Sequence, residues 1–253
     1  GFFAAITVEC ENVVIDLNDK SIRQSNEFYL KQRFFSLIEL ASSPFIPNQG
    51  PANFGNNVIY SKNVIIQNGY FGLTSHYGIH GNGCKNLILQ NLNFYSFEVA
   101  GISINGTEVL LGRNLNLCYG SNDVKVLSTY TASRFIMKFL NKLLDYDNDA
   151  SFKGKTINSI INNLKLEMLK LENAVIYNKS LPENNLFANH TGISDCNMYG
   201  ILLNPLGVAV GKLRENRNGA IGNENICLHD IHIENLKCNP VEIRGDRKST
   251  RLN

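Results

Sequence analysis

A set of polar residues in the first half of the chain has the side-chain types that acid–base chemistry needs. Its members are His80, Ser103 and Lys125, with Glu98 and Asp123 at the turns that lead into them. Each of the first three directly follows an isoleucine or valine, so alternation along a strand would place them on one outward line. A histidine or lysine there could remove a carbon-bound proton or activate water. These five residues are the candidate catalytic set; the alternative is that they are only solvated.

A second set recurs at a spacing of 23 residues and has the types that bind sugars. It combines amides, a cation and an aromatic ring on what would be the outward side of successive strands. Amides and cations hydrogen-bond to hydroxyl groups, and aromatic rings stack on apolar ligand faces. The set therefore predicts a polysaccharide or glycan partner, unless it only decorates the surface. Its members are Gln67, Gln90, Arg113, Tyr70, Asn93 and Asn116, with His229 and His232 further along the chain.

These spacings come from a repeat of 23 residues. The segments 62–71, 85–94 and 108–117 share one template, and residues 225–233 repeat it downstream. A fixed period of this length is typical of a solenoid, because each unit buries its apolar face only by stacking on its neighbours.

Within each unit apolar and polar residues alternate, which predicts strands rather than helices. Each strand is interrupted at the same place by an asparagine, as expected at a tight turn. Stacked asparagines can exchange amide hydrogen bonds along the axis of the stack. We therefore expect a ladder of Asn68, Asn91 and Asn114, with Asp230 in a related place.

The repeats resemble the right-handed parallel β-helix superfamily, which has the pectin-lyase-like fold. Residues 6–22 strengthen the resemblance, because Asn12-Val13-Val14-Ile15-Asp16-Leu17-Asn18 is similar to opening coils of that family. The apolar spacings of helical and leucine-rich repeats are absent. The expected fold class is an all-β solenoid with helical insertions.

The resemblance implies a carbohydrate-directed protein, such as a polysaccharide lyase, epimerase or hydrolase. The motifs of polygalacturonases and alginate epimerases and the Ca²⁺ site of pectate lyases are absent from this sequence. The alternative is therefore a non-catalytic structural or glycan-binding module of a virion or cell surface. Proteins of that kind usually trimerise through one wall, so a homotrimer is an expectation. An extracellular or surface location would fit both interpretations.

Composition limits the other classes of function. A net charge of +2 over 253 residues argues against a nucleic-acid groove or an anionic-membrane patch. No apolar run is long enough to span a membrane. The six cysteines lack metal-ligand spacing, so we expect free thiols packed near the core, with no metal and no cofactor.

Two segments interrupt the strand pattern. Residues 26–41 have a broad apolar face and predict a short helix. Residues 130–180 predict a helical hairpin, with one helix at 133–144 and a second beginning at Thr156. A line of outward apolar residues could be covered by this hairpin or by a partner subunit. The line consists of Val14, Ile65, Ile88, Leu111 and Cys227.

We expect one domain over residues 1–245. Residues 246–253 leave the alternating pattern and resemble translated sequencing-adapter read-through, so they are interpreted as a non-native tail.

Overall fold

The computed structural model describes most of the chain. The described residues are 3–41, 59–118, 126, 128–188, 199–205, 223–234, 236, 240–243 and 251–252. Contacts divide the chain into two compact units. Unit 1 comprises residues 1–121 and 197–253, and unit 2 comprises residues 122–196. Unit 2 includes all of the helical insertion predicted at about 130–180.

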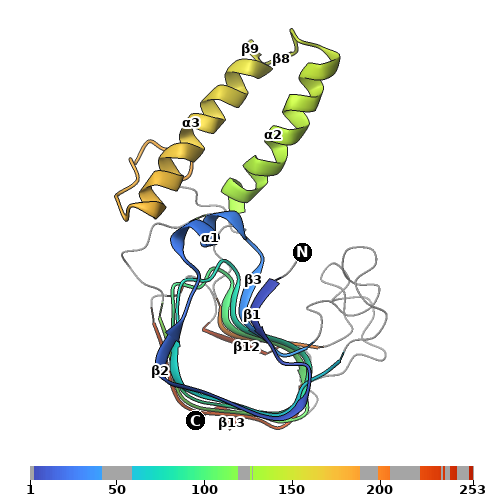
Figure 1. Cartoon of the computed structure of the whole chain (residues 1–253), viewed down its shortest axis with the longest axis vertical. Helices are drawn as coiled ribbons and strands as arrows, with labels where there is room; N and C mark the ends of the chain where they lie inside the picture. The colour runs from blue at the N-terminus through green and yellow to red at the C-terminus, as the bar shows by residue number, and fades with distance from the viewer. Residues whose placement is uncertain are drawn as a thin grey trace. The chain divides into compact units, whose positions relative to one another are not determined.

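Unit 1 consists of two ladders, and within each ladder parallel strands stack on one another (Figure 1). The first ladder has the order β1–β3–β5–β6–β10–β12, and the second has the order β2–β4–β5–β7–β11–β13. The long strand β5 takes part in both. The fold is therefore largely β and parallel, with added helices, as predicted. The strands are β1 (Phe3–Thr7), β2 (Glu11–Ile22), β3 (Phe35–Glu39), β4 (Lys62–Phe71), β5 (Tyr77–Tyr95), β6 (Ala100–Thr107), β7 (Leu110–Cys118), β10 (Tyr199–Asn204), β11 (Ile226–Glu234), β12 (Val241–Ile243) and β13 (Arg251–Leu252).

The pairing of β4, β5 and β7 follows the sequence repeat. Gln67 lies opposite Gln90, and Gln90 lies opposite Arg113, so partners are one repeat apart. Strand β11 then places His229 opposite Arg113. Since side chains alternate along a strand, this register sends equivalent residues of each repeat to the same side.

The predicted asparagine ladder is present. Asn91 donates to Oδ1 of Asn68 at 2.9 Å, and Asn114 donates to Oδ1 of Asn91 at 3.0 Å. All three have positive φ values, between 48° and 56°. Asparagine tolerates this left-handed conformation better than most residues, which explains its place at the bend. Asp230 has φ 54° at the equivalent position of β11.

A second asparagine ladder, which we did not predict from the sequence, lies on β2, β4 and β5. Asn63 donates to Oδ1 of Asn12, and Asn86 donates to Oδ1 of Asn63, each at 2.8 Å. These three asparagines also have positive φ. The repeat therefore bends at two asparagine positions rather than one.

The prediction of a helix over residues 26–41 needs correction. Helix α1 (Asn26–Lys31) is short and is capped by Ser25, whose Oγ accepts from the backbone N–H of Phe28 at 3.2 Å. Residues 35–39 instead form β3, which pairs with β1 and β5. Pairing on both edges outweighs the local helical pattern of the segment.

The core of unit 1 lies between the ladders. Buried aliphatic side chains from successive strands stack on one another, and the rings of Phe71 and Phe94 stack with centroids 4.8 Å apart. The predicted outward apolar line is also in register, and we call it the apolar row. It comprises Val14, Ile65, Ile88, Leu111 and Cys227. What covers the apolar row stays a prediction.

Unit 2 contains a helical hairpin. Helix α2 (Ser128–Tyr146) and helix α3 (Ile157–Ile176) are joined through the short strands β8 (Ser151–Phe152) and β9 (Lys155–Thr156). Helix α3 begins at Ile157, one residue after the predicted start at Thr156; Thr156 is the N-cap, and its hydroxyl accepts from the backbone N–H of Ser159 at 3.2 Å.

Other predictions have mixed outcomes. Among the described residues no helix is long and apolar enough to cross a membrane. Cys84 is a buried free thiol as expected, but Cys10 and Cys227 are exposed. Cys196 and Cys238 lie outside the described residues. From the segment interpreted as a non-native tail, β13 pairs with β11.

Candidate functional site

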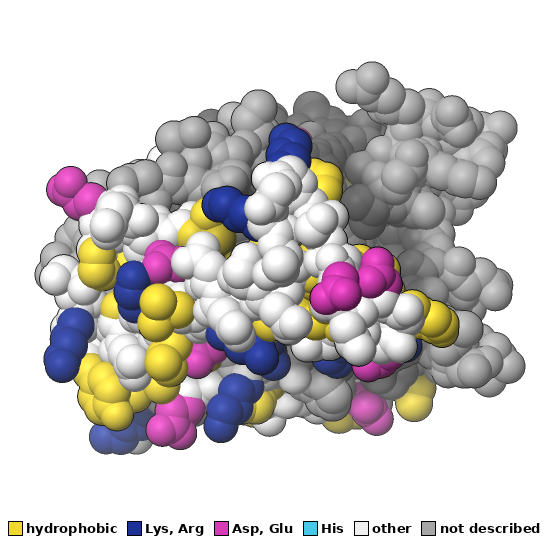
Figure 2. All heavy atoms as spheres, turned by 90° about the horizontal axis from the view of Figure 1, so that it is seen from above, with side chains coloured by type: hydrophobic (Ala, Val, Ile, Leu, Met, Phe, Trp, Pro, Cys, Tyr) yellow, Lys and Arg dark blue, Asp and Glu magenta, His cyan; other side chains and the backbone are white. Residues whose placement is uncertain are grey.

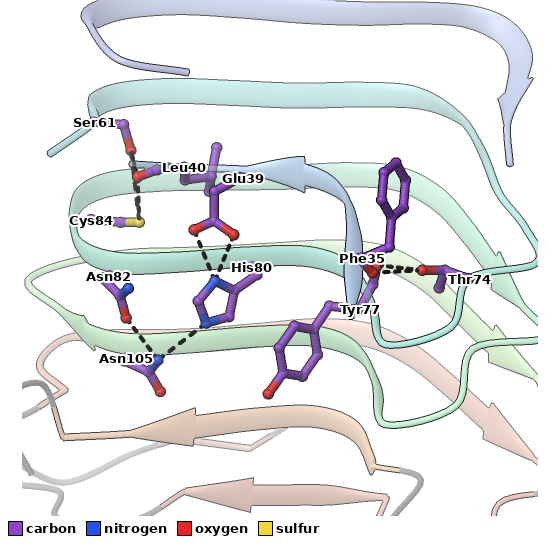
Figure 3. Close-up of polar contacts among 10 residues, drawn as sticks. All are labelled: Phe35, Glu39, Leu40, Ser61, Thr74, Tyr77, His80, Asn82, Cys84 and Asn105. Atoms are coloured by element: carbon purple, nitrogen blue, oxygen red, sulfur yellow. Dashed lines mark hydrogen bonds and ion pairs between the residues drawn. The ribbon is translucent and has the colours of Figure 1, made fainter. Parts of the chain in front are cut away.

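His80 is held between a carboxylate and an amide (Figure 3). Parallel pairing of β3, β5 and β6 places Glu39, His80 and Ser103 in one row. The Nδ1 atom of His80 lies 2.8 Å from each carboxylate oxygen of Glu39. Its Nε2 atom lies 3.2 Å from Nδ2 of Asn105. Both ring nitrogens are therefore engaged by neighbouring strands.

The hydrogen bonds around Asn105 assign the tautomer of His80. Oδ1 of Asn105 accepts from Asn204 at 3.1 Å, and Nδ2 of Asn105 donates to Oδ1 of Asn82 at 2.8 Å. The second proton on Nδ2 is then directed at His80 Nε2, which must accept it. The proton of the ring is consequently on Nδ1, where it is donated to the Glu39 carboxylate. In this arrangement the imidazole donates from Nδ1 to the carboxylate and accepts at Nε2.

Tyr77, which is partly buried, and Ser103, which is buried, complete this cluster. The ring of Tyr77 stacks on that of His80 with centroids 4.8 Å apart and planes 10° apart. Burial raises the pKa of Tyr77 to about 12, although its hydrogen bond with Ser103 acts in the opposite direction. Tyr77 is therefore a neutral phenol at physiological pH. We call Glu39, Tyr77, His80, Ser103 and Asn105 the histidine cluster.

Glu98 belongs to a different network. Tyr29 and Arg33 both donate to its carboxylate, and Arg33 also donates to the backbone carbonyl of Tyr29 at 2.8 Å. Burial is the largest single influence on the pKa of Arg33 and would lower it, but the charge of Glu98, the proximity of Tyr29 and the hydrogen bonds to both residues together raise it. This ion pair fastens the segment containing α1 to the turn between β5 and β6. The predicted catalytic role of Glu98 stays a prediction.

His76 lies close to both networks. Burial, followed by the proximity of His80 and Arg33, lowers the pKa of His76 to about 3. Its ring meets that of Tyr77 edge-on, with centroids 4.2 Å apart. His76 is therefore neutral at physiological pH, and its ring contacts the histidine cluster through Tyr77.

The structure brings together part of the predicted catalytic set. His80 and Ser103 are register neighbours, as predicted. They point away from the core isoleucines but are only 3% and 1% exposed, so the predicted solvent-facing line needs correction. Glu98 pairs with Arg33 instead, and Asp123 and Lys125 lie outside the described residues.

Sequence reasoning missed Glu39, the strongest partner of His80. It was assigned to a helix, and its separation from His80 does not match the repeat of 23 residues. A usable signal was present in the dipeptides Ile38-Glu39, Ile79-His80 and Ile102-Ser103, each an isoleucine followed by a polar residue. In the structure the three isoleucines are register partners in the core.

The predicted glycan-binding residues form two rows on the outward face of the second ladder. Gln67, Gln90 and Arg113 form one row, and Gln90 donates to Oε1 of Gln67 at 2.7 Å. Gln67 in turn donates to Asp16 at 2.7 Å. Hydrogen bonds from Gln67, from the backbone of Asn18 and from Asn68 lower the pKa of Asp16. Asp16 thus ends the row with a negative charge.

The second row runs beside the first, across the asparagine bend. Tyr70, Asn93 and Asn116 are register partners, and Asn116 donates to Oδ1 of Asn93 at 3.4 Å. Tyr70, Arg113 and Asn116 are exposed, while Gln67, Gln90 and Asn93 are partly buried. The predicted register is confirmed, and the binding role stays a prediction. We call these six residues the polar wall.

The described residues contain no group of three or more His, Cys, Asp or Glu side chains that could hold a metal ion. The described residues of the site offer hydrogen-bonding and acid–base groups. No protein-family model, curated protein or solved structure matches the chain.

Proposed function

We propose that unit 1 is a right-handed parallel β-helix that binds a polysaccharide along the polar wall. The observation that carries this proposal is the register of the wall, in which Gln67, Gln90 and Arg113 occupy equivalent places on adjacent strands. Adjacent strands are about 4.8 Å apart, so an extended ligand along the stack would meet a polar group at each step. A repeating ligand suits a repeating surface.

The chemistry of the wall is also suitable for sugars. The amide ladder uses one N–H group of Gln90 on Gln67. An amide has two N–H groups and a carbonyl with two lone pairs, so hydrogen-bonding capacity remains for ligand hydroxyls. The exposed ring of Tyr70 provides a flat apolar surface beside them.

Binding of the full chain to a panel of polysaccharides, measured by affinity electrophoresis or calorimetry, tests the proposal. The double substitution Gln90→Ala with Arg113→Ala should weaken binding by about tenfold, because each removes about one net hydrogen bond. Lys85→Ala is the matched control, since Lys85 lies on β5 in an exposed ion pair with Glu108 outside the wall. Undiminished binding by the double variant, or no binding by the wild type, would reject the wall.

The second candidate is an enzyme, a polysaccharide lyase, epimerase or hydrolase. The histidine cluster favours it, because Nε2 of His80 carries an accepting lone pair while Glu39 can stabilise the imidazolium formed by proton uptake. Turnover would require access to a side chain that is 3% exposed. Uronic-acid polysaccharides are the test substrates: unsaturated products would indicate a lyase and new reducing ends a hydrolase. Activity retained in His80→Ala would remove this site.

A structural or adhesive role through a homotrimer is a variant of the binding proposal. The apolar row supports it, since a continuous outward line of aliphatic side chains is typical of a contact surface. Sedimentation of wild type and of Ile88→Glu tests it, because a trimer built on this row should dissociate in the variant. An extracellular or surface location follows from the proposed ligand.

A further inference from the structure

Helix α2 has two apolar faces, and one of them packs against other residues of unit 2. The inner face carries Tyr130, Ser133, Met137, Leu140 and Leu144, spaced alternately by three and four residues. Tyr130 donates from its hydroxyl to Glu172 of α3 at 2.6 Å, and its ring meets that of Phe187 edge-on. The other apolar residues of this face are partly buried. This face therefore belongs to the packing within unit 2.

The second face of α2 is apolar but exposed, and we call it the outer seam. It consists of Ala132, Ile136, Phe139, Leu143 and Tyr146. The exposed fractions are 49% for Ile136, 71% for Phe139, 43% for Leu143 and 91% for Tyr146. Figure 2 shows hydrophobic side chains lying open among charged side chains on the face seen from above. Contiguous exposed apolar surface of this kind usually marks a contact.

The spacing of the outer seam indicates what kind of surface covers it. Ala132, Ile136, Phe139, Leu143 and Tyr146 follow one another at intervals of four, three, four and three residues. This is the a/d spacing of a coiled coil, in which each side chain fits between four residues of a facing helix. A seam so narrow fits another helix better than a flat surface.

We propose that the facing helix is α2 of a second copy of this chain, packed antiparallel. With full overlap of two such helices, Ile136 faces Phe139 of the second copy, and Ala132 faces Leu143 of the second copy. Both contacts occur twice, because a two-fold axis relates the helices. Each layer then combines a smaller with a larger side chain, which fills the space between helices evenly.

The residues that flank the outer seam are complementary to themselves in the same arrangement. Phe135 and Lys142 lie seven residues apart on one side of the seam. Antiparallel helices bring the same flank together, so Lys142 lies beside the exposed ring of Phe135 of the second copy. A cation over an aromatic face is attractive. This flank thus contributes two favourable contacts to the pair.

Sedimentation equilibrium of the full chain between about 1 and 100 μM tests the proposal. The wild type should show a monomer–dimer equilibrium in this range. Phe139→Glu should raise the dimer dissociation constant by more than about tenfold, because it buries a charge in the seam. Leu169→Glu is the control: Leu169 is an exposed leucine of α3, 51% exposed and outside the seam, and its replacement should leave dimerisation unchanged. Circular dichroism of each variant checks that the helices remain folded.

A pair of substitutions at Phe135 tests the direction of packing. Phe135→Glu and Phe135→Lys remove the same ring, but only the glutamate attracts Lys142 of the second copy. The lysine variant should therefore dimerise about tenfold more weakly than the glutamate variant at low salt, and the difference should shrink at high salt. Equal dissociation constants for both variants would overturn the antiparallel arrangement.

Three outcomes would overturn the proposal as a whole. The first is a wild type that stays monomeric throughout the concentration range. The second is an oligomer that Phe139→Glu does not weaken, or a trimer that depends on the apolar row. The third is a monomer that binds vesicles of phosphatidylcholine and phosphatidylglycerol in a Phe139-dependent way, which would assign the outer seam to a membrane surface. The proposal does not depend on glycan binding, since unit 2 carries it alone.

Discussion

Nδ1 of His80 lies 2.8 Å from both carboxylate oxygens of Glu39, and both side chains are buried. The two residues come from β5 and β3, which pair in parallel. Their separation in the sequence does not match the repeat of 23 residues. A buried carboxylate needs such a donor, because an uncompensated charge in the interior is costly. The pair therefore stabilises unit 1 whether or not His80 also performs chemistry.

Replacement of Glu39 should destabilise the protein. In Glu39→Ala the Nδ1–H group of His80 stays buried without its acceptor, so we expect a loss of about 2 kcal/mol in the free energy of unfolding. Glu39→Gln retains a carbonyl acceptor and should lose less. Urea denaturation measures both. Glu11→Ala, which removes an exposed ion pair with Lys62, is the control and should change stability by less than about 1 kcal/mol. An equal loss in Glu11→Ala would contradict this prediction.

The asparagine ladder can be separated into its two contributions at Asn91. Asn91→Ala loses the amide hydrogen bonds and also places alanine, which tolerates a positive φ less well than asparagine, at φ 54°. It should therefore lower the free energy of unfolding by about 2 kcal/mol. Asn91→Gly loses the same hydrogen bonds but accepts the positive φ. It should therefore be more stable than Asn91→Ala in thermal or urea denaturation. The reverse order would show that the bend does not determine the choice of residue.

The raised pKa of Tyr77 predicts a loss of stability at high pH. Its pKa rises from 10.0 to about 12 on folding, chiefly through burial. Between these values the unfolded chain releases the phenolic proton and the folded chain retains it, so stability falls as pH rises from 10 towards 12. The full effect is up to about 3 kcal/mol. Tyr77→Phe should reduce this pH dependence, as measured by urea denaturation across the range. Cys84 remains in both proteins, so its raised pKa cancels in the comparison.

The lowered pKa of His76 predicts a loss of stability at low pH. Its pKa falls from 6.5 to about 3 on folding, with burial as the largest cause. The unfolded chain binds a proton below pH 6.5 and the folded chain does not, so stability falls as pH decreases from 6.5 towards 3. Nuclear magnetic resonance of the ring protons should show His76 neutral at pH 5 in the folded protein. A midpoint near 6.5 for this ring would refute the assignment.

The amino-acid sequence by itself determined the parts of the structure that repeat. The spacing of 23 residues fixed the register of Gln67, Gln90 and Arg113, because a one-residue slip would have turned the apolar side chains away from the core. It also fixed the ladder of Asn68, Asn91 and Asn114, since only a few residue types accept a positive φ at the bend. The alternation of apolar and polar residues and the residue types at turns are local properties, so they can be interpreted without knowing which distant segments pack nearby.

Only the tertiary structure decided where the repeat fails. Residues 35–39 have a local pattern compatible with a helix, yet they form β3 because β1 and β5 offer hydrogen-bonding edges on both sides. The burial of His80 and its pairing with Glu39 follow from that strand. Hydrogen-bonding partners distant in sequence outweigh a local preference of less than about 1 kcal/mol per residue. The separation of β3 from these partner strands does not follow the repeat of 23 residues, so the repeat could not predict the pairing.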